Sequence, residues 1–118
     1  MEDNQDFEDF KKYFAEYQER FGLNGYKVYL NYGPLNSKFA EIMVDQESMV
    51  ATVCLNSKLS AKDKLHKNIR RSAKHEAIHL LLHRLEDRAR FRYVTQTELY
   101  ETVEELVFKL EKLIGEVN

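Results

Sequence analysis

In the stretch Ser72-Ala73-Lys74-His75-Glu76-Ala77-Ile78-His79-Leu80-Leu81-Leu82, an HExxH motif lies inside an apolar run with helical spacing. At 3.6 residues per turn, His75 and His79 fall one above the other on one helix face, so both imidazoles can reach one ion. Glu76 lies off that line, but its longer side chain can reach a water molecule on the same ion. The stretch therefore predicts a helix that carries two metal ligands and a general base.

The competing interpretation is a solvated helix face that carries two histidines and a glutamate by chance. The apolar residues of 77–82 argue against it, because they bury most of the helix circumference. Buried imidazole and carboxylate groups without partners are costly. We therefore favour a metal site, with Zn²⁺ as the ion, and a zinc-dependent peptidase as the first functional hypothesis.

The composition indicates one globular domain over residues 1–118, because 43% of the residues are hydrophobic and a chain of this length can bury a real core. Lys and Arg number 18 against 20 Asp and Glu, so net charge does not indicate a nucleic-acid partner. Basic clusters at 67–71 and 88–92 are more typical of solvated faces than of phosphate contacts.

A single cysteine, Cys54, excludes an intramolecular disulfide and suits a reducing compartment. The acidic stretch 1–6 has no apolar segment of the kind that secretion signals carry, and no run approaches 18 apolar residues. We expect a cytoplasmic protein without a membrane span.

The predicted fold class is α+β, with a helix, three strands, the motif helix and a final helix in that order. Aromatic residues at three- and four-residue steps predict an amphipathic helix over 5–21. Three strands are expected at 26–32, 39–44 and 49–55, the last two as a plausible hairpin, in a mostly antiparallel sheet.

Two capping boxes mark the helices of the second half. Ser60 opens a helical region that extends to about Arg88 and bends or breaks near Asn68. Thr95 opens the final helix, which runs towards Gly115.

A catalytic zinc ion takes three protein ligands and leaves one position open for water. His83 continues the histidine series, but it lies about 12 Å along the helix axis from His75, too far for one ion. Cys54 would be an unusual ligand in a hydrolytic site, and the sequence does not place His66. A carboxylate from the final helix is the remaining source.

The angular position of each residue on the final helix, at 100° per residue, selects among its glutamates. Glu104 falls within the apolar arc, whereas Glu101 and Glu105 fall outside it. Glu104 is the predicted third ligand, with Glu105 and Glu101 as reserves, although a carboxylate at the core edge can equally pair with Lys or Arg. Glu111 shares the arc of Glu104. The arc consists of Leu99, Val103, Leu106, Leu110 and Leu113, extended by Tyr100, Val107 and Phe108.

An HExxH helix preceded by a small sheet and followed by a Glu-bearing helix resembles a gluzincin-type zincin reduced to its core. The chain is similar to the small peptidases of the minigluzincin, ImmA/IrrE-like and SprT-like groups, which are common in bacteria and their phages. ImmA/IrrE-like members usually carry Gly where this chain has Ile78. The resemblance covers roughly residues 26–105 and implies a zincin-like core.

The resemblance also implies a role for each motif residue. His75, His79 and Glu104 would be the metal ligands and Glu76 the base that activates water. An edge strand near residues 49–55 would hold an extended peptide substrate by strand addition.

The expected function is hydrolysis of peptide bonds in a protein or peptide substrate. Two alternatives remain: a catalytically silent zinc-binding interaction or assembly module, and a SprT-like DNA-associated protein that contacts phosphate through Arg88, Arg90 and Arg92. The presence of Glu76 favours chemistry, because a structural zinc site needs no base. The group that stabilises the oxyanion is open among Tyr93, Tyr100, Arg92 and His83.

Overall fold

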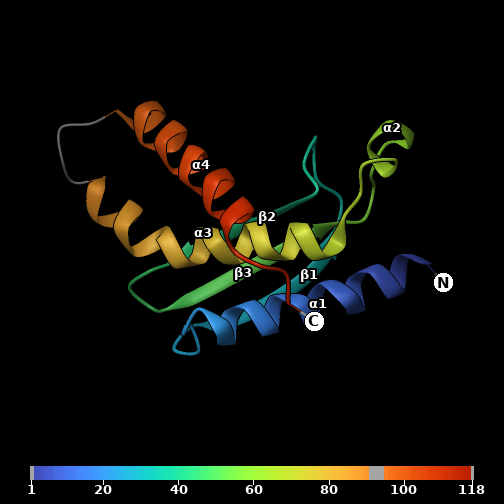
Figure 1. The fold of residues 1–118 in the computed structure, drawn as a ribbon, viewed down its shortest axis with the longest axis horizontal. Helices are drawn as coiled ribbons and strands as arrows, with labels where there is room; N and C mark the ends of the chain where they lie inside the picture. Colours follow the sequence, from blue (N-terminus) through green and yellow to red (C-terminus); the bar gives the residue numbers. More distant parts are fainter. Residues whose placement is uncertain (1, 91–94, 118) are drawn as a thin grey trace.

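The structure is a computed structural model that describes residues 2–90 and 95–117 (Figure 1). It is an α+β fold, as the sequence predicts. Its elements in chain order are α1 (Glu2–Arg20), β1 (Lys27–Gly33), β2 (Ala40–Asp45), β3 (Val50–Asn56), α2 (Ala61–Lys64), α3 (Ile69–Ala89) and α4 (Gln96–Leu113).

The sheet is mixed, with strand order β1-β3-β2. The hairpin of β2 and β3 is confirmed by antiparallel pairing from Ala40 with Leu55 to Asp45 with Val50. β1 instead pairs with β3 in parallel, so the expectation of a mostly antiparallel sheet is wrong for one of the two pairings. β2 lies on the opposite side of β3 from β1 and runs antiparallel to β3. β1 therefore does not form a hairpin with β2, and it pairs with β3 in the same direction.

β3 is the central strand, and its inward residues Ala51, Val53 and Leu55 are buried. Such a strand, hydrogen-bonded on both sides, cannot accept a further strand. The prediction that residues 49–55 form a substrate-holding edge is therefore wrong. The edge strand that packs against α3 is β2.

The core lies between the sheet and the two long helices α1 and α3 (Figure 1). Phe10, Phe14 and Tyr17 of α1 are fully buried, as their spacing predicts. They pack with the inward residues of β3 and with Ala73, Ala77 and Leu80 of α3. This packing fixes α3, and hence the HExxH motif, relative to the sheet.

The helical region after residue 60 breaks where the sequence predicts. Ser60 caps the short α2 by accepting a hydrogen bond from the backbone N–H of Asp63. Asn68 caps α3 in the same way through the N–H of Arg71. Each cap satisfies a backbone donor that the first turn of a helix leaves unpaired, so α3 begins at Ile69, six residues before His75.

α4 crosses α3 on the side away from α1, and its C-terminal segment returns towards α1 (Figure 1). Both halves of its predicted capping box are present, at Thr95 and Glu98. Its packing face contains Val103 and Val107, which contact Ile78 of α3. Leu113, 80% exposed, lies outside that face, so the apolar arc predicted from the sequence was too wide.

Residues 114–117, which follow α4, form hydrogen bonds with α1 and α3. Val117 is buried in the core, and its backbone N–H donates to the hydroxyl of Tyr17, 3.1 Å away. Lys74 donates to the carbonyl of Ile114 and to Glu116, at 3.2 Å in each case. α4 is therefore held at its far end as well as along α3.

None of the helices that the structure describes is long and apolar enough to cross a membrane.

Candidate metal centre

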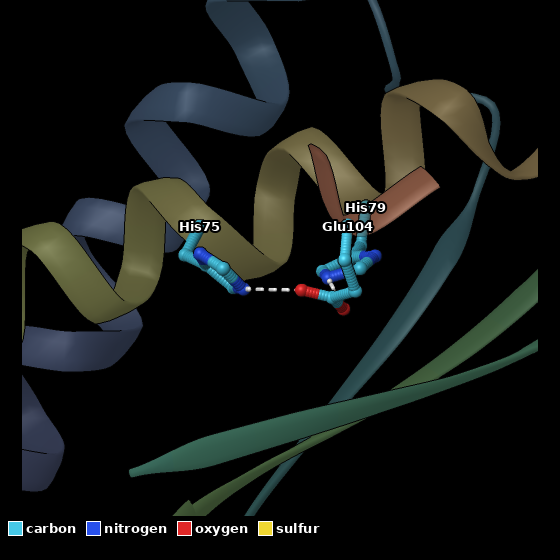
Figure 2. A group of neighbouring side chains, drawn as sticks. All are labelled: His75, His79 and Glu104. Carbon is cyan, nitrogen blue, oxygen red and sulfur yellow. Dashed lines mark ion pairs between the residues drawn. The ribbon is translucent and has the colours of Figure 1, made fainter. Parts of the chain in front are cut away.

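Two histidines from α3 and one glutamate from α4 converge on one point (Figure 2). Nε2 of His79 lies 2.9 Å from Oε1 of Glu104, and Nε2 of His75 lies 3.9 Å from Oε2 of the same carboxylate. One donor atom from each of the three residues lies within 4.8 Å of the others. The structure thus brings Glu104, the carboxylate chosen from the sequence, to both motif histidines.

The three side chains lie in a cleft of about 760 Å³ between α3, α4 and β2. They are partly exposed, with 17% to 23% of each side chain accessible to solvent. Residues of β2 from Ala40 to Val44 line the opposite wall. The cluster is therefore open to a ligand as large as a peptide.

Glu76 is 6% exposed and borders the same cleft. Burial and the nearby carboxylate of Glu104 raise the pKa of Glu76 to about 8, although Lys38 opposes the shift. Two carboxylates this close in a poorly hydrated site repel each other when both are charged. A divalent cation beside them would relieve that repulsion.

Burial and the neighbouring ring of His75 lower the pKa of His79 to about 4. His79 is therefore a neutral imidazole at neutral pH. A neutral ring has one nitrogen lone pair free for a metal ion, and that is the form in which histidine binds metals.

Glu111 contacts the cluster through a hydrogen bond with His75. It is 4% exposed, and its Oε2 lies 2.8 Å from Nδ1 of His75. Its other oxygen accepts a hydrogen bond from Nε of Arg71. Burial alone would raise the pKa of Glu111, but hydrogen bonds from His75 and Arg71 bring it below its ordinary value. The charged carboxylate thus accepts the Nδ1 proton of His75, which leaves Nε2 of that ring as the lone-pair nitrogen.

The sequence did not identify the role of Glu111, which counted only as a second acid on the arc of Glu104. The available signal was its spacing. Glu104 and Glu111 lie two turns apart on one face of α4. His75 and His79 lie one turn apart on one face of α3. Two antiparallel helices can match both pairs, but only the crossing of α4 over α3 shows that they do.

Phe108 also packs against the His75 ring, with 5.1 Å between ring centroids. Glu111 and Phe108 together restrict the rotation of this imidazole, so its ring orientation is fixed by contacts from α4.

The other carboxylates and the cysteine considered as ligands lie elsewhere. Glu105 is exposed and pairs with Lys109 at 2.8 Å, and Glu101 is also exposed. Cys54 lies on β3, where burial raises the pKa of its thiol. None of the three belongs to the cluster.

The remaining polar candidates border the cleft or fall outside the described residues. His66, His83 and Tyr100 line the cleft without joining the cluster. Arg92 and Tyr93 lie outside the residues that the structure describes.

No protein-family model, curated protein or solved structure matches this chain. What the chain does must therefore be inferred from the chemistry of the cleft.

Proposed function

We propose that this chain is a zinc-dependent metallopeptidase of the gluzincin type. The observation that supports it best is the convergence of His75, His79 and Glu104 beside the buried carboxylate of Glu76 in an open cleft. Two imidazoles and one carboxylate make up the ligand set of a catalytic zinc site that keeps a position for water.

The spacing of the donor atoms suits zinc. Ligand atoms about 2.0–2.1 Å from a tetrahedral ion lie about 3.3 Å apart. His79 lies 2.9 Å from Oε1 of Glu104 and His75 lies 3.9 Å from Oε2, and one donor atom from each of the three residues lies within 4.8 Å of the others. Side-chain rotations within rotamer wells, which bring one oxygen of Glu104 and the two imidazole nitrogens closer to that spacing, would complete the site.

A zinc ion held there would lower the pKa of a water molecule and polarise a substrate carbonyl. Glu76 would then act as the general base that takes a proton from the attacking water as its oxygen bonds to the carbonyl carbon. When the carbon–nitrogen bond breaks, Glu76 passes that proton to the leaving amine. The products are one carboxylic acid and one amine, so a single carboxylate serves both steps.

β2 offers a place for an extended substrate. Among the described residues it pairs only with β3, and the residues of its strand line the cleft. An edge strand can add a peptide by backbone hydrogen bonds, which suits unfolded chains of varied sequence. The substrate class proposed is therefore an extended, unfolded segment of protein.

A zinc-binding module without activity is the main alternative. Glu76 argues against it, because a buried carboxylate with a raised pKa is costly and a purely structural site gains nothing from it. A DNA-binding role has less support, since Arg90 is paired with Glu86 at 3.2 Å.

Three proteins test the proposal: the wild type, Glu76→Gln and His79→Ala. We expect the wild type and Glu76→Gln to bind one equivalent of zinc and His79→Ala to bind it weakly. Only the zinc-loaded wild type should cleave β-casein, an unfolded protein. Zinc binding without cleavage would favour the module, and failure of the wild type to bind zinc would overturn the metal site itself.

A further inference from the structure

We propose that His83 is a substrate-binding residue of this cleft, which accepts a hydrogen bond from a backbone N–H of the bound peptide through Nε2. This inference rests on the proposed peptidase function and specifies how the substrate is held. His83 follows His79 by one turn of α3, is half-buried, and lines the same cleft without belonging to the metal cluster.

The hydrogen bonds around Gln46 fix the tautomer of His83. Nδ1 of His83 lies 3.0 Å from Oε1 of Gln46. The same oxygen accepts a hydrogen bond from the hydroxyl of Tyr26, at 2.9 Å, while the amide NH₂ of Gln46 faces the sulfur of Met49. Because an amide oxygen cannot donate, the neutral His83 ring must carry its proton on Nδ1.

That assignment leaves Nε2 of His83 as a hydrogen-bond acceptor. Within the described residues it has no hydrogen-bond partner, although the ring borders the cleft. The ring is neutral at pH 7, because burial lowers its pKa despite the opposing effect of Glu86. The cleft therefore contains an oriented acceptor that a donor from a bound ligand can reach.

The position of His83 suits a peptide that lies along β2. Four residues of helix place it about 6 Å beyond His79 along the axis. An extended peptide advances about 3.3 Å per residue, so His83 is level with a residue about two positions from the scissile bond. Gln46, which follows directly after the last residue of β2, anchors the ring at the end of that strand.

A backbone N–H is the donor most consistent with this arrangement. In an extended strand, N–H groups alternate in direction, so those that do not meet β2 point towards the opposite wall, formed by α3. A contact to the backbone would also keep the cleft tolerant of side-chain sequence.

The tautomer is tested first, by nitrogen-15 NMR of the histidine rings in the zinc-loaded protein at pH 7.5. We expect His83 to show the Nδ1-protonated form, with a protonated-type signal for Nδ1 and a lone-pair signal for Nε2. A ring protonated at Nε2 would overturn the proposal without reference to activity.

Substrate binding is tested with two substitutions, each of which retains the hydrogen-bonding role of one of the two ring nitrogens. His83→Asn keeps a donor near Nδ1 for Gln46 but removes the acceptor, and His83→Gln can place an amide oxygen near the former Nε2. Loss of one hydrogen bond should raise the KM for β-casein about three- to tenfold in His83→Asn. The kcat and zinc content should stay unchanged, and His83→Gln should recover part of the loss. Arg84→Gln, at an exposed neighbouring position, is the matched control.

A titration of labelled β-casein by fluorescence anisotropy in the zinc-loaded Glu76→Gln background separates this inference from the proposed function. An unchanged dissociation constant in Glu76→Gln/His83→Asn would overturn the role of His83 even if the wild type is an active peptidase. A weakened constant would support it even if the wild type cleaves nothing. A fall in kcat with unchanged KM would also overturn it, because the residue would then act in the chemical step.

Discussion

The carboxylate of Glu111 lies 2.8 Å from Nδ1 of His75 and is itself held by the guanidinium of Arg71. The link runs from α4 back to α3, so the helix that carries Glu104, the proposed third ligand, also orients His75, the proposed first ligand. A carboxylate behind a ligating imidazole fixes its tautomer and increases its basicity. The affinity of the proposed metal site should thus depend on Glu111, a residue that is not one of the proposed ligands.

Replacement of Glu111 by Gln should therefore weaken zinc binding by about 10- to 100-fold. The amide retains the size of the side chain but loses the charge that stabilises the Nδ1–H of His75. Competition with a chromophoric chelator measures the affinity, and Glu105→Gln, on an exposed part of α4, is the control. Equal affinities for Glu111→Gln and the control would contradict a supporting role.

Zinc should stabilise the fold, because the proposed site takes ligands from two helices and is complete only when both are in place. At a free zinc concentration one hundred times the dissociation constant, the expected gain is about 2.7 kcal/mol, or roughly 10 °C in Tm. Differential scanning fluorimetry with and without zinc measures it. His79→Ala should lose the gain and Glu76→Gln should keep it. A gain that survives in His79→Ala would point to a different binding site.

The pKa of Glu76 predicts how the stability of the metal-free protein depends on pH. The folded pKa of about 8 lies above the ordinary value, so the folded state binds more protons and stability falls as pH rises towards 8. His79 has the opposite shift, and its contribution is lost only as pH falls below its ordinary pKa of about 6.5. Between pH 6.5 and 8 the effect of Glu76 should dominate.

Urea unfolding in the presence of a chelator tests this dependence. The free energy of unfolding of the wild type should decrease from pH 6.5 to 8, and that of Glu76→Gln should remain nearly flat. Parallel curves for the two proteins would show that Glu76 is not the titrating group.

Tyr17 should link the stability of the chain end to alkaline pH. Burial, together with the hydrogen bond to Glu116, raises the pKa of Tyr17 to about 12, although the N–H of Val117 opposes the shift. Since the ordinary value is 10.0, the folded state holds the proton longer, and stability should fall between pH 10 and 12. Tyr17→Phe should remove this part of the decrease.

At pH 7 the same substitution should cost about 1–2 kcal/mol, because it leaves the N–H of Val117 without its partner. Urea unfolding measures both effects, and Tyr29→Phe, on the exposed side of β1, is the control. Identical loss in the two variants would mean that the Tyr17 hydroxyl does not secure the chain end.

The features that were predicted correctly from the sequence are those determined by residues close together along the chain. The histidine spacing follows from helix geometry, and the caps at Ser60 and Thr95 depend on the next three residues. The parallel pairing of β1 with β3 was not predicted, because strand patterns do not specify which distant strand is the partner. The role of Glu111 depends in the same way on how two helices cross.

The prediction of Glu104 as the third ligand lies between these two cases. Its place in an apolar arc selected Glu104, but the arc itself was too wide, since Leu113 is exposed. The structure places Glu104 beside both histidines because it lies one residue from Val103, near the centre of the face that packs on Ile78. Residues near the edges of the arc could not be assigned without the neighbouring helix.

α4 packs mainly on α3, and the proposed ligands come from both of these helices. An ion between His79 and Glu104 would act as a removable cross-link that closes the chain segment between them, and closing a loop reduces the conformational entropy of the open states. Chelation should therefore increase the rate at which α4 separates from α3 while the sheet and α1 stay intact. Amide hydrogen exchange would then become faster in α4 alone. The concentration of metal would thus determine how long α4 stays packed on α3, and hence how long the cleft keeps that wall.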